Sequence, residues 1–183
     1  MSLTLPYIPQ SSDSDELFSP SLIDQSVQDS LEPGYTLRPL NRNDYHKGYF
    51  ENLKALTWVG DITHDQYLEH FDWMRTKGEG WFYNVVIEHE GRIVGNGVLI
   101  VERKFIWGLG RVGHIEEICI HKDYQKQGLG KAVVKALDFI AVKEGVQRSI
   151  LDCGFQKTEY YMKCGYKCVG IQMARSWEEE KQG

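Results

Sequence analysis

Apolar positions repeat along the chain with two different periods, and the sharpest change between them lies within residues 113–134. Residues 115–120 first alternate and then concentrate apolar side chains, which predicts a partly buried strand. Over residues 129–140 the apolar side chains recur at spacings of three and four, which predicts one face of a helix. The six residues 125–130 in between contain two glycines. The stretch is therefore predicted to run as a strand, a glycine loop and a helix.

A glycine loop that leads into a helix can bind an anion. The first backbone N–H groups of a helix have no partner within it, and the helix dipole adds positive potential there. Gly128 and Gly130 let the backbone approach a phosphate closely. The loop is not a P-loop, because Ala132 stands where a P-loop needs Ser or Thr, and it lacks the third glycine of the dinucleotide fingerprint. A pyrophosphate-bearing ligand is expected.

The same two periods predict the remaining elements. Strands are expected over residues 35–40, 81–88, 92–103, 147–153 and 167–175, and helices over residues 43–56, 63–75 and 157–163. Thr63 and Gln66 form a capping box, Glu90 and Gly91 a turn, and Gly165 a helix C-cap. Antiparallel strands followed by a strand–helix crossover predict a mixed sheet and an α+β fold.

Charge and composition divide the chain into a tail and a domain. Residues 1–33 are rich in Ser, Pro, Asp and Gln without periodicity, which predicts a disordered acidic tail, although Leu22, Ile23 and Val27 could dock a short segment. The folded domain is expected over residues 34–177, with a charged tail at 178–183. Residues 1–34 hold six acidic residues and no lysine or arginine, so the remainder carries 21 basic and 20 acidic residues. This balance suits small anionic ligands rather than nucleic acid.

Cysteine usage and hydropathy indicate a compartment. Four cysteines show no paired C-x-x-C spacing, which argues against zinc and predicts buried thiols in a reducing compartment: Cys119, Cys153, Cys164 and Cys168. The N-terminus has no charged-then-apolar leader, and no apolar run is long enough to cross a membrane. We therefore expect a cytoplasmic protein with no metal, no membrane partner and no nucleic-acid partner.

Residues 125–130 have the form Q-x-x-G-x-G, which resembles the signature of the GNAT superfamily of acetyl-CoA-dependent N-acetyltransferases. The predicted order of elements is similar to the GNAT fold over about residues 35–177. Within that superfamily, five segments resemble the glucosamine 6-phosphate N-acetyltransferases: LTWVG (56–60), VERKFI (101–106), GHIEEI (113–118), ILDC (150–153) and YYMKCGY (160–166). The resemblance implies direct transfer of the acetyl group of acetyl-CoA to the amine of glucosamine 6-phosphate in a ternary complex, which leads to UDP-N-acetylglucosamine. It also implies a homodimer whose sites borrow residues from the partner.

Acetyl transfer needs a neutral amine, a stabilised oxyanion and a proton for the departing thiolate. The resemblance assigns the proton to Tyr161 and contact with the sugar amine to Asp152, and Glu116 is the third catalytic candidate. Without the resemblance, Tyr161 is an ordinary core or surface aromatic residue and Asp152 an ordinary turn carboxylate.

Glu116 and Glu117 are adjacent on a predicted strand, so their side chains point to opposite faces unless the strand bulges. The resemblance implies such a bulge, which turns the backbone around Ile118 toward the thioester and the pantetheine arm. The candidates for binding acetyl-CoA are Ile118, Cys119, Ile120, Gln125, Lys126, Gln127, Gly128, Leu129, Gly130, Lys131 and Tyr161.

A sugar phosphate needs a fixed cation, and the resemblance implies Lys104. By themselves, Lys104 is typical of a solvated strand end and Thr57 of a helix cap. The substrate-binding candidates are Thr57, Lys104, Trp107, Glu116, Glu117, Asp152 and Arg175.

The chain departs from the resembling family at several of these positions. Trp107 replaces a His, Lys157 replaces an Asn and Glu117 replaces an Asp, while Ser176 aligns with an Arg that Arg175 precedes by one residue. A one-residue offset moves a strand side chain to the other face. Two alternatives therefore stay open: a GNAT enzyme for another small amine or amino sugar, and a catalytically silent protein that binds acetyl-CoA.

Overall fold

The computed structural model describes residues 15–177, which form one five-stranded mixed sheet in the order β1-β2-β3-β4-β5. The first four strands pair antiparallel, and β5 pairs parallel to β4. The strands are β1 (Tyr35–Pro39), β2 (Phe82–His89), β3 (Arg92–Arg103), β4 (Arg111–Ile120) and β5 (Arg148–Ile150). The mixed sheet and the α+β fold predicted from the sequence are confirmed.

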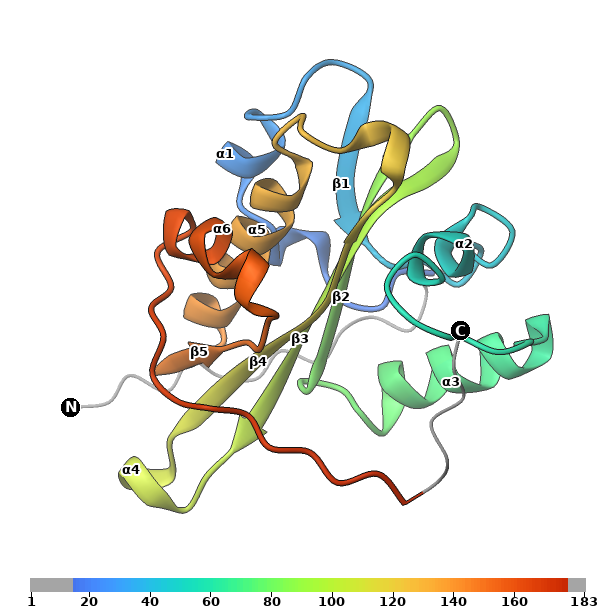
Figure 1. Ribbon diagram of the computed structural model, residues 1–183. Helices are drawn as coiled ribbons and strands as arrows, with labels where there is room; N and C mark the ends of the chain where they lie inside the picture. Colours follow the sequence, from blue (N-terminus) through green and yellow to red (C-terminus); the bar gives the residue numbers. More distant parts are fainter. Residues whose placement is uncertain (1–14, 178–183) are drawn as a thin grey trace.

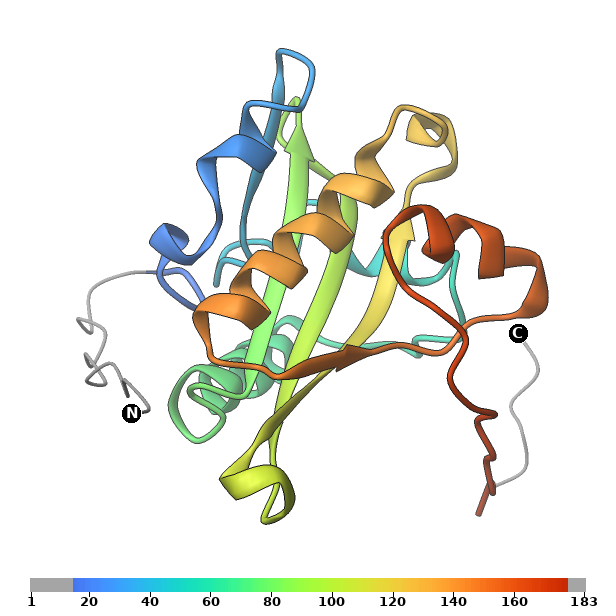
Figure 2. The same cartoon turned by 90° about the vertical axis from the view of Figure 1, so that its left-hand side faces the viewer.

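Helices cover both faces of the sheet. The helical segments are η1 (Pro20–Leu22), α1 (Gln25–Gln28), α2 (Tyr49–Leu53), α3 (His64–Thr76), α4 (Ile106–Leu109), η2 (Lys122–Tyr124), α5 (Leu129–Lys143), η3 (Phe155–Lys157) and α6 (Thr158–Lys163). Figure 1 shows α1, α5 and α6 on one side of the sheet and α2 and α3 on the other. In Figure 2, α5 lies across the face of the sheet.

Helix α5 packs closely on β3 because the strand has no side chain at Gly97. A Cβ atom at Gly97 would come within 2.6 Å of a Val133 methyl group and 2.5 Å of the Ile118 side chain. The apolar face predicted for the helix is buried in this layer, as Val133, Leu137 and Ile140 show. This close packing holds α5, and with it the N-terminus of the helix, in a fixed position relative to the sheet.

The structure confirms the predicted capping box, the predicted turn and the predicted helix C-cap. Thr63 Oγ1 accepts a hydrogen bond from the Gln66 backbone, and the Gln66 side chain accepts one from the Thr63 backbone, which confirms the capping box. Glu90 and Gly91 both have positive φ in the β2–β3 turn, and Gly165 has a φ of 96° after α6. Short-range hydrogen bonds and backbone sterics decide these features, so a few residues suffice to predict them.

The helix predicted from residue 43 begins only at Tyr49. Asp44 is completely buried, accepts the Asn41 backbone N–H, and forms a bidentate ion pair with Arg38 at 2.7 and 2.8 Å. Gly48 then has a φ of 90°. The ion pair with β1 thus holds the segment in turns where the apolar spacing alone predicts a helix.

The predicted C-terminal strand, residues 167–175, is wrong for a single copy of the chain. The segment is extended but joins no strand of residues 15–177, and it leaves the body of the domain in Figure 2. Its alternating apolar residues Val169, Ile171 and Met173 are exposed, the last two by more than 90%. Alternation predicts a strand conformation, but it does not supply the strand that pairs with it.

The expected disorder is wrong for residues 15–33, while residues 1–14 and 178–183 lie outside the described part of the chain. Leu17, Phe18 and Val27 are buried, and α1 packs against α5. The Gln28 side chain donates to the Tyr35 carbonyl at 2.9 Å and accepts the Leu37 N–H at 2.8 Å. A polar segment with a few apolar anchors thereby covers the free edge of β1, and its packing on α5 is a long-range contact that composition cannot show.

The cysteines differ in burial, which corrects the expectation that all four are buried. Cys119 is buried, Cys164 is partly buried, and Cys153 and Cys168 are exposed; all four are free thiols. Among residues 15–177, no helix is long and apolar enough to cross a bilayer, and no group of His, Cys, Asp or Glu is arranged to hold a metal ion.

Replacing Gln28 by Ala should lower the free energy of unfolding by about 1–2 kcal/mol, because two backbone groups at the β1 edge lose their partner. Urea denaturation measures this change. Gln25→Ala is the matched control on the same helix, since Gln25 bonds only the exposed Asp29 carboxylate. Equal effects of the two substitutions would contradict the edge-covering role of Gln28.

Candidate active site

The site is built around a bulge in β4. The register between β3 and β4 shifts between Asn96 and Val98, and Glu117 has a φ of 54° at that point. The bulge implied by the family resemblance is therefore present. The ladder between β4 and β5 is short and ends before the bulge, at the pair His114 and Ile150. The remainder of β4 thus diverges from β5 and leaves an opening between the two strands.

The bulge reverses which side chains of β4 face α5. Before it, Ile115 packs in the core on the α5 face, so His114 and Glu116 face α2 and α3. After it, Ile118 and Ile120 pack on the α5 face, near Gly97 and Gly130. The extra residue is Glu117. Glu116 can therefore face the α2 side of the opening while two isoleucines anchor the strand on the opposite face.

Two buried asparagines hold the bulge, and neither was predicted from the sequence. Asn96 donates to the Glu117 carbonyl at 2.7 Å, and Asn52 of α2 donates to the Asn96 side chain at 2.6 Å. Asn52 also bonds the backbone and thiol of Cys119. Cys119, predicted to contact the cofactor, thus uses its thiol and carbonyl to bind α2. The feature of the sequence that points to this contact is a polar residue, Asn96, inside the apolar predicted strand 92–103.

Glu116 and Asp152 lie close enough to interact electrostatically. Burial, and after it the negative charge of Asp152, raises the pKa of the Glu116 carboxyl above its usual range. Asp152 follows β5 by two residues and is exposed. Glu116 of β4 and Asp152, which follows β5, thus influence each other across the opening, and the partly buried Glu116 binds a proton more readily than a free glutamate does.

Helix α6 brings Tyr161 to the same place. Burial raises the pKa of the Tyr161 phenol, and the charges of Cys153, Cys164, Asp152 and Glu116 raise it further. The phenol therefore stays protonated at neutral pH. Proximity to both carboxylates places Tyr161 with the other two predicted catalytic residues.

Two contacts fix α6, and neither was predicted. The Tyr166 hydroxyl donates to Asp138 of α5 at 2.6 Å. A Cβ atom at Gly130 would lie 2.6 Å from the Tyr160 hydroxyl, so the glycine is needed for the close approach of α6 to the first turn of α5. The second glycine of the Q-x-x-G-x-G loop thus serves helix packing.

The loop before α5 offers the anion site that its sequence predicts. Gly128 caps the helix with a φ of 82°, and no atom lies within 4 Å of the position that a Cβ would occupy there. The first turn of this 15-residue helix presents unpaired backbone N–H groups to that open space. Leu129 is buried, so it contributes backbone only, whereas Lys126 and Lys131 are exposed beside the loop. These residues fit a pyrophosphate.

The loop is tied to the N-terminal side of the molecule. The Tyr35 hydroxyl donates to the Gln127 side chain at 2.8 Å, and the Tyr35 ring stacks on His89 at 4.3 Å. The Gln125 side chain donates to the Ile120 carbonyl at 3.2 Å. Tyr35 is a residue that the sequence analysis missed, because its partner is 92 positions away.

Lys104 has a partner that the sequence analysis did not consider. Its ammonium lies 2.5 Å from Glu102, and the other oxygen of Glu102 lies 3.0 Å from His114 Nε2. These three side chains and Glu116 lie along the α2 face of β3 and β4. Lys104 therefore stands at the outer end of a row of charged groups that ends at Glu116.

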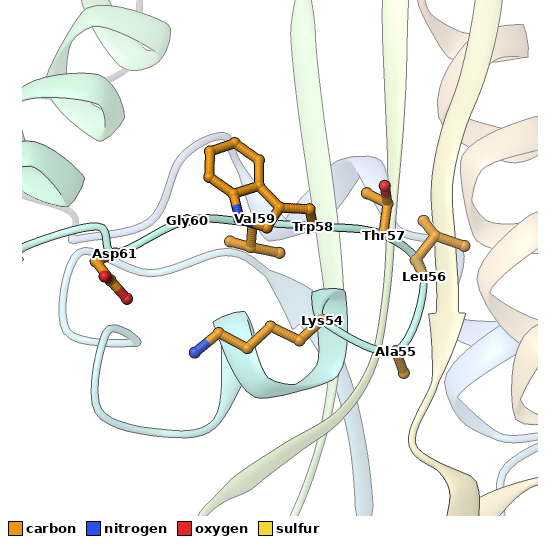
Figure 3. A pocket seen from close by; sticks show the side chains of 8 residues that line it. All are labelled: Lys54, Ala55, Leu56, Thr57, Trp58, Val59, Gly60 and Asp61. Carbon is orange, nitrogen blue, oxygen red and sulfur yellow. The ribbon is translucent and has the colours of Figure 1, made fainter. Parts of the chain in front are cut away.

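Thr57 lies on the loop between α2 and α3, where residues 54–61 line a cavity of about 620 Å³. In Figure 3 the Thr57 hydroxyl and the Trp58 ring project on one side of the loop, and the Lys54 side chain extends along the other. The cavity belongs to this loop alone, so it does not include Glu116, Asp152 or Tyr161.

The structure does not bring Trp107 and Arg175 to the carboxylates within one copy of the chain. Trp107 lies at the tip of the β3–β4 hairpin, more than half exposed, with a φ of 55°. Arg175 lies on the extended C-terminal segment, with its guanidinium 4.2 Å from the Trp177 ring. A neighbouring copy would have to complete any site that uses Arg175.

Comparison with known proteins agrees with this geometry. The model of the acetyltransferase (GNAT) family matches residues 47–166. The chain belongs to the GNAT acetyltransferase family. The match covers the catalytic candidates, the bulge and the loop before α5.

Two curated relatives and one solved structure are named for the same activity. Glucosamine 6-phosphate N-acetyltransferase of Candida albicans is 37% identical over 143 residues, which is 78% of this chain and 96% of that protein. Glucosamine 6-phosphate N-acetyltransferase 1 of Dictyostelium discoideum is 33% identical and covers 79% of this chain and 92% of its own. The crystal structure of the Arabidopsis thaliana glucosamine-6-phosphate N-acetyltransferase superposes with a TM-score of 0.77 at 32% identity, over 79% of this chain and 99% of its own.

Replacing Asn96 by Ala should reduce turnover at least tenfold, because the Glu117 carbonyl loses the bond that holds the bulge and Glu116 moves. The same change should cost about 1–3 kcal/mol of stability, since it leaves buried polar groups unpaired. Steady-state kinetics and urea denaturation measure the two effects separately. Asn84→Ala is the control: Asn84 is also buried and lies on the same face of the sheet, but its amide donates to the Tyr49 hydroxyl and not to the Glu117 carbonyl. A folded Asn96→Ala protein with normal turnover would refute the role of the bulge.

Proposed function

We propose that this chain is a glucosamine 6-phosphate N-acetyltransferase, which moves the acetyl group of acetyl-CoA to the sugar amine in a ternary complex. The observation that carries the proposal is that Glu116, Asp152 and Tyr161 influence one another electrostatically, while Tyr160, next to Tyr161, packs against Gly130 in the first turn of α5. The names of the curated relatives support the choice of acceptor. The cytoplasmic location rests on the cysteine usage and hydropathy of the sequence, and the place ahead of UDP-N-acetylglucosamine rests on the family resemblance.

In this proposal Glu116 removes the proton from the substrate ammonium, and Asp152 orients the amine. The raised pKa of Glu116 supports this role, because a general base whose pKa is closer to neutrality accepts a proton more effectively. The neutral amine then attacks the acetyl carbonyl carbon and forms a tetrahedral oxyanion, whose collapse breaks the C–S bond. The second proton that the nitrogen loses restores the proton that Tyr161 gives to the leaving sulfur. The carboxylate of Asp152 stabilises the ammonium form that first binds.

Tyr161 gives its proton to the sulfur that leaves. Its raised pKa keeps the phenol protonated until that moment, and its place on α6 is fixed by the Tyr166–Asp138 bond. Acetyl-CoA supplies the thioester and a thiolate leaving group. The backbone of the α5 N-terminus binds its pyrophosphate, and Gln125 to Lys131 and the open edge of β4 at Ile118 and Ile120 hold the rest of the donor.

The acceptor side depends on Lys104, with Thr57 and Glu117 as further contacts. Lys104 supplies the cation for the 6-phosphate. Trp107, which stands where the resembling family has a His, is exposed on the hairpin tip. Because this replacement changes a residue expected to bind the acceptor, another small amine or amino sugar is the second candidate.

We also propose that the enzyme is a homodimer. The segment 167–175 has the alternation of a strand and exposes Val169, Ile171 and Met173. The hairpin tip adds exposed Phe105 and Trp107. A second copy would cover both apolar surfaces and would give the segment a strand to pair with, and it could bring Arg175 to a sugar phosphate.

A thiol-release assay with acetyl-CoA and a panel of amines tests the acceptor and the acid together. We expect glucosamine 6-phosphate to be the best acceptor, and Tyr161→Phe to lower kcat by about 10²-fold while acetyl-CoA binding changes less than about threefold. Tyr160→Phe, on the neighbouring position of α6, is the matched control and should retain most of the kcat. Turnover with other amines but no phosphorylated amino sugar would reject the acceptor, and parallel loss of binding and kcat in Tyr161→Phe would reject the proton donor.

Sedimentation equilibrium tests the dimer. The full chain should have twice its sequence mass, and Ile171→Asp should produce a monomer because a charge cannot be buried unpaired in the interface. Val142→Asp is the control, since Val142 is an exposed apolar residue of α5, away from the C-terminal segment. A wild-type monomer, or a dimer that withstands Ile171→Asp, would contradict the proposed interface.

A further inference from the structure

Glu102 holds two different partners with its two oxygens. Oε1 lies 2.5 Å from the Lys104 ammonium, and Oε2 lies 3.0 Å from His114 Nε2. Both hydrogen bonds, with that of Lys104 the larger, hold the pKa of Glu102 below its usual range. The carboxylate is therefore ionised at neutral pH and divided between a cation at the hairpin end and a histidine inside the sheet.

His114 connects this carboxylate to Glu116. The two residues stand two positions apart on the same face of β4, and His114 pairs with Ile150, two positions before Asp152. The charge of His114 lowers the pKa of Glu116, against the burial and the charges of Asp152 and Glu117 that raise it. The charge of His114 thus offsets part of the rise that burial causes and favours the ionised form of Glu116, which is the form that accepts the substrate proton.

A phosphate group at Lys104 would disturb this arrangement. A dianion competes with the monoanionic Glu102 for the ammonium, and the two anions repel each other. The ion pair that must open is partly exposed, so breaking it costs little. Once Lys104 turns to the phosphate, the Glu102 carboxylate is left to His114.

We propose that Glu102 is a positioning residue that couples phosphate occupancy at Lys104 to the base Glu116 through His114. The inference rests on the proposed function. It means that the phosphate contributes to the chemical step as well as to binding, which is how binding energy at a remote group raises kcat. An amino sugar without phosphate leaves Lys104 on Glu102 and is turned over slowly.

Supplying the phosphate as a separate molecule tests the coupling. Acetylation of glucosamine is measured at saturating acetyl-CoA with and without inorganic phosphate, at constant ionic strength set by chloride. We expect phosphate to raise the kcat for glucosamine about 5-fold or more, a typical size for coupling between two sites. The KM for glucosamine should change little.

Variants separate the coupling from simple phosphate binding. Glu102→Gln should lose the activation by phosphate and lower the kcat for glucosamine 6-phosphate about tenfold without raising its KM, because Lys104 no longer has a competing carboxylate. Lys104→Ala should lose the activation and raise that KM. Glu69→Gln, an exposed acid on α3, is the matched control and should behave as wild type.

The outcomes distinguish this inference from the proposed function. If the wild-type enzyme does not acetylate glucosamine 6-phosphate, the proposed function itself fails. If it does, but phosphate leaves the kcat for glucosamine unchanged or still activates the Glu102→Gln enzyme, the coupling is wrong. A rise in KM with unchanged kcat in Glu102→Gln would likewise show a purely structural role for Glu102 and overturn the inference.

Discussion

The hydrogen bond from Asn96 to the carbonyl of Glu117 is the constraint on which the rest of the site depends. It fixes an extra residue in β4, and that residue changes which side chains face each side of the sheet. Without it, strict alternation would give Ile118 and Glu116 the same face. With it, Ile118 anchors the strand against α5 while Glu116 faces α2, and the strand diverges from β5 to leave the opening. Asn52 extends the constraint to α2, because its amide donates to the Asn96 side chain.

Contacts with other segments of the chain hold the short helices α1 and α6 and the loop before α5 in place around this opening. The four-residue helix α1 would not be stable alone, yet Gln28 binds the β1 edge and Val27 is buried against the core. Helix α6 has six residues and is held by Tyr166 on Asp138. Tyr35 bonds Gln127 in the loop before α5. The cofactor loop and the acid of the proposed mechanism are thus both positioned by residues far away in the sequence.

Features that depend on residues close together in the sequence were predicted correctly, whereas features that depend on tertiary contacts were not. The capping box at Thr63, the turn at Gly91 and the apolar face of α5 depend on neighbours within a few residues, and the sequence predicted all three. The helix expected at residue 43 failed because Arg38 draws Asp44 into an ion pair. The disorder expected for residues 15–33 failed because Leu17 and Phe18 find a surface that only the folded sheet provides. The roles assigned to Glu116, Asp152, Tyr161 and Lys104 came from a resemblance, and the contacts of Glu102, Asn96 and Tyr35 came from the structure.

The sequence by itself determined the strand–loop–helix unit, the succession of the first five strands along the chain and the membership of an acetyltransferase family. These properties follow from local periodicity and from the spacing of short motifs, which can be recognised without knowledge of the fold. Only the tertiary structure decided that Asn96 and Asn52 hold the bulge in β4, that Gly130 admits Tyr160, and that Glu102 joins Lys104 to His114. Each of these depends on which strands or helices become neighbours. Pairing register and helix packing are properties of the whole sheet, and a one-residue shift in β4 is enough to change the chemistry that it presents.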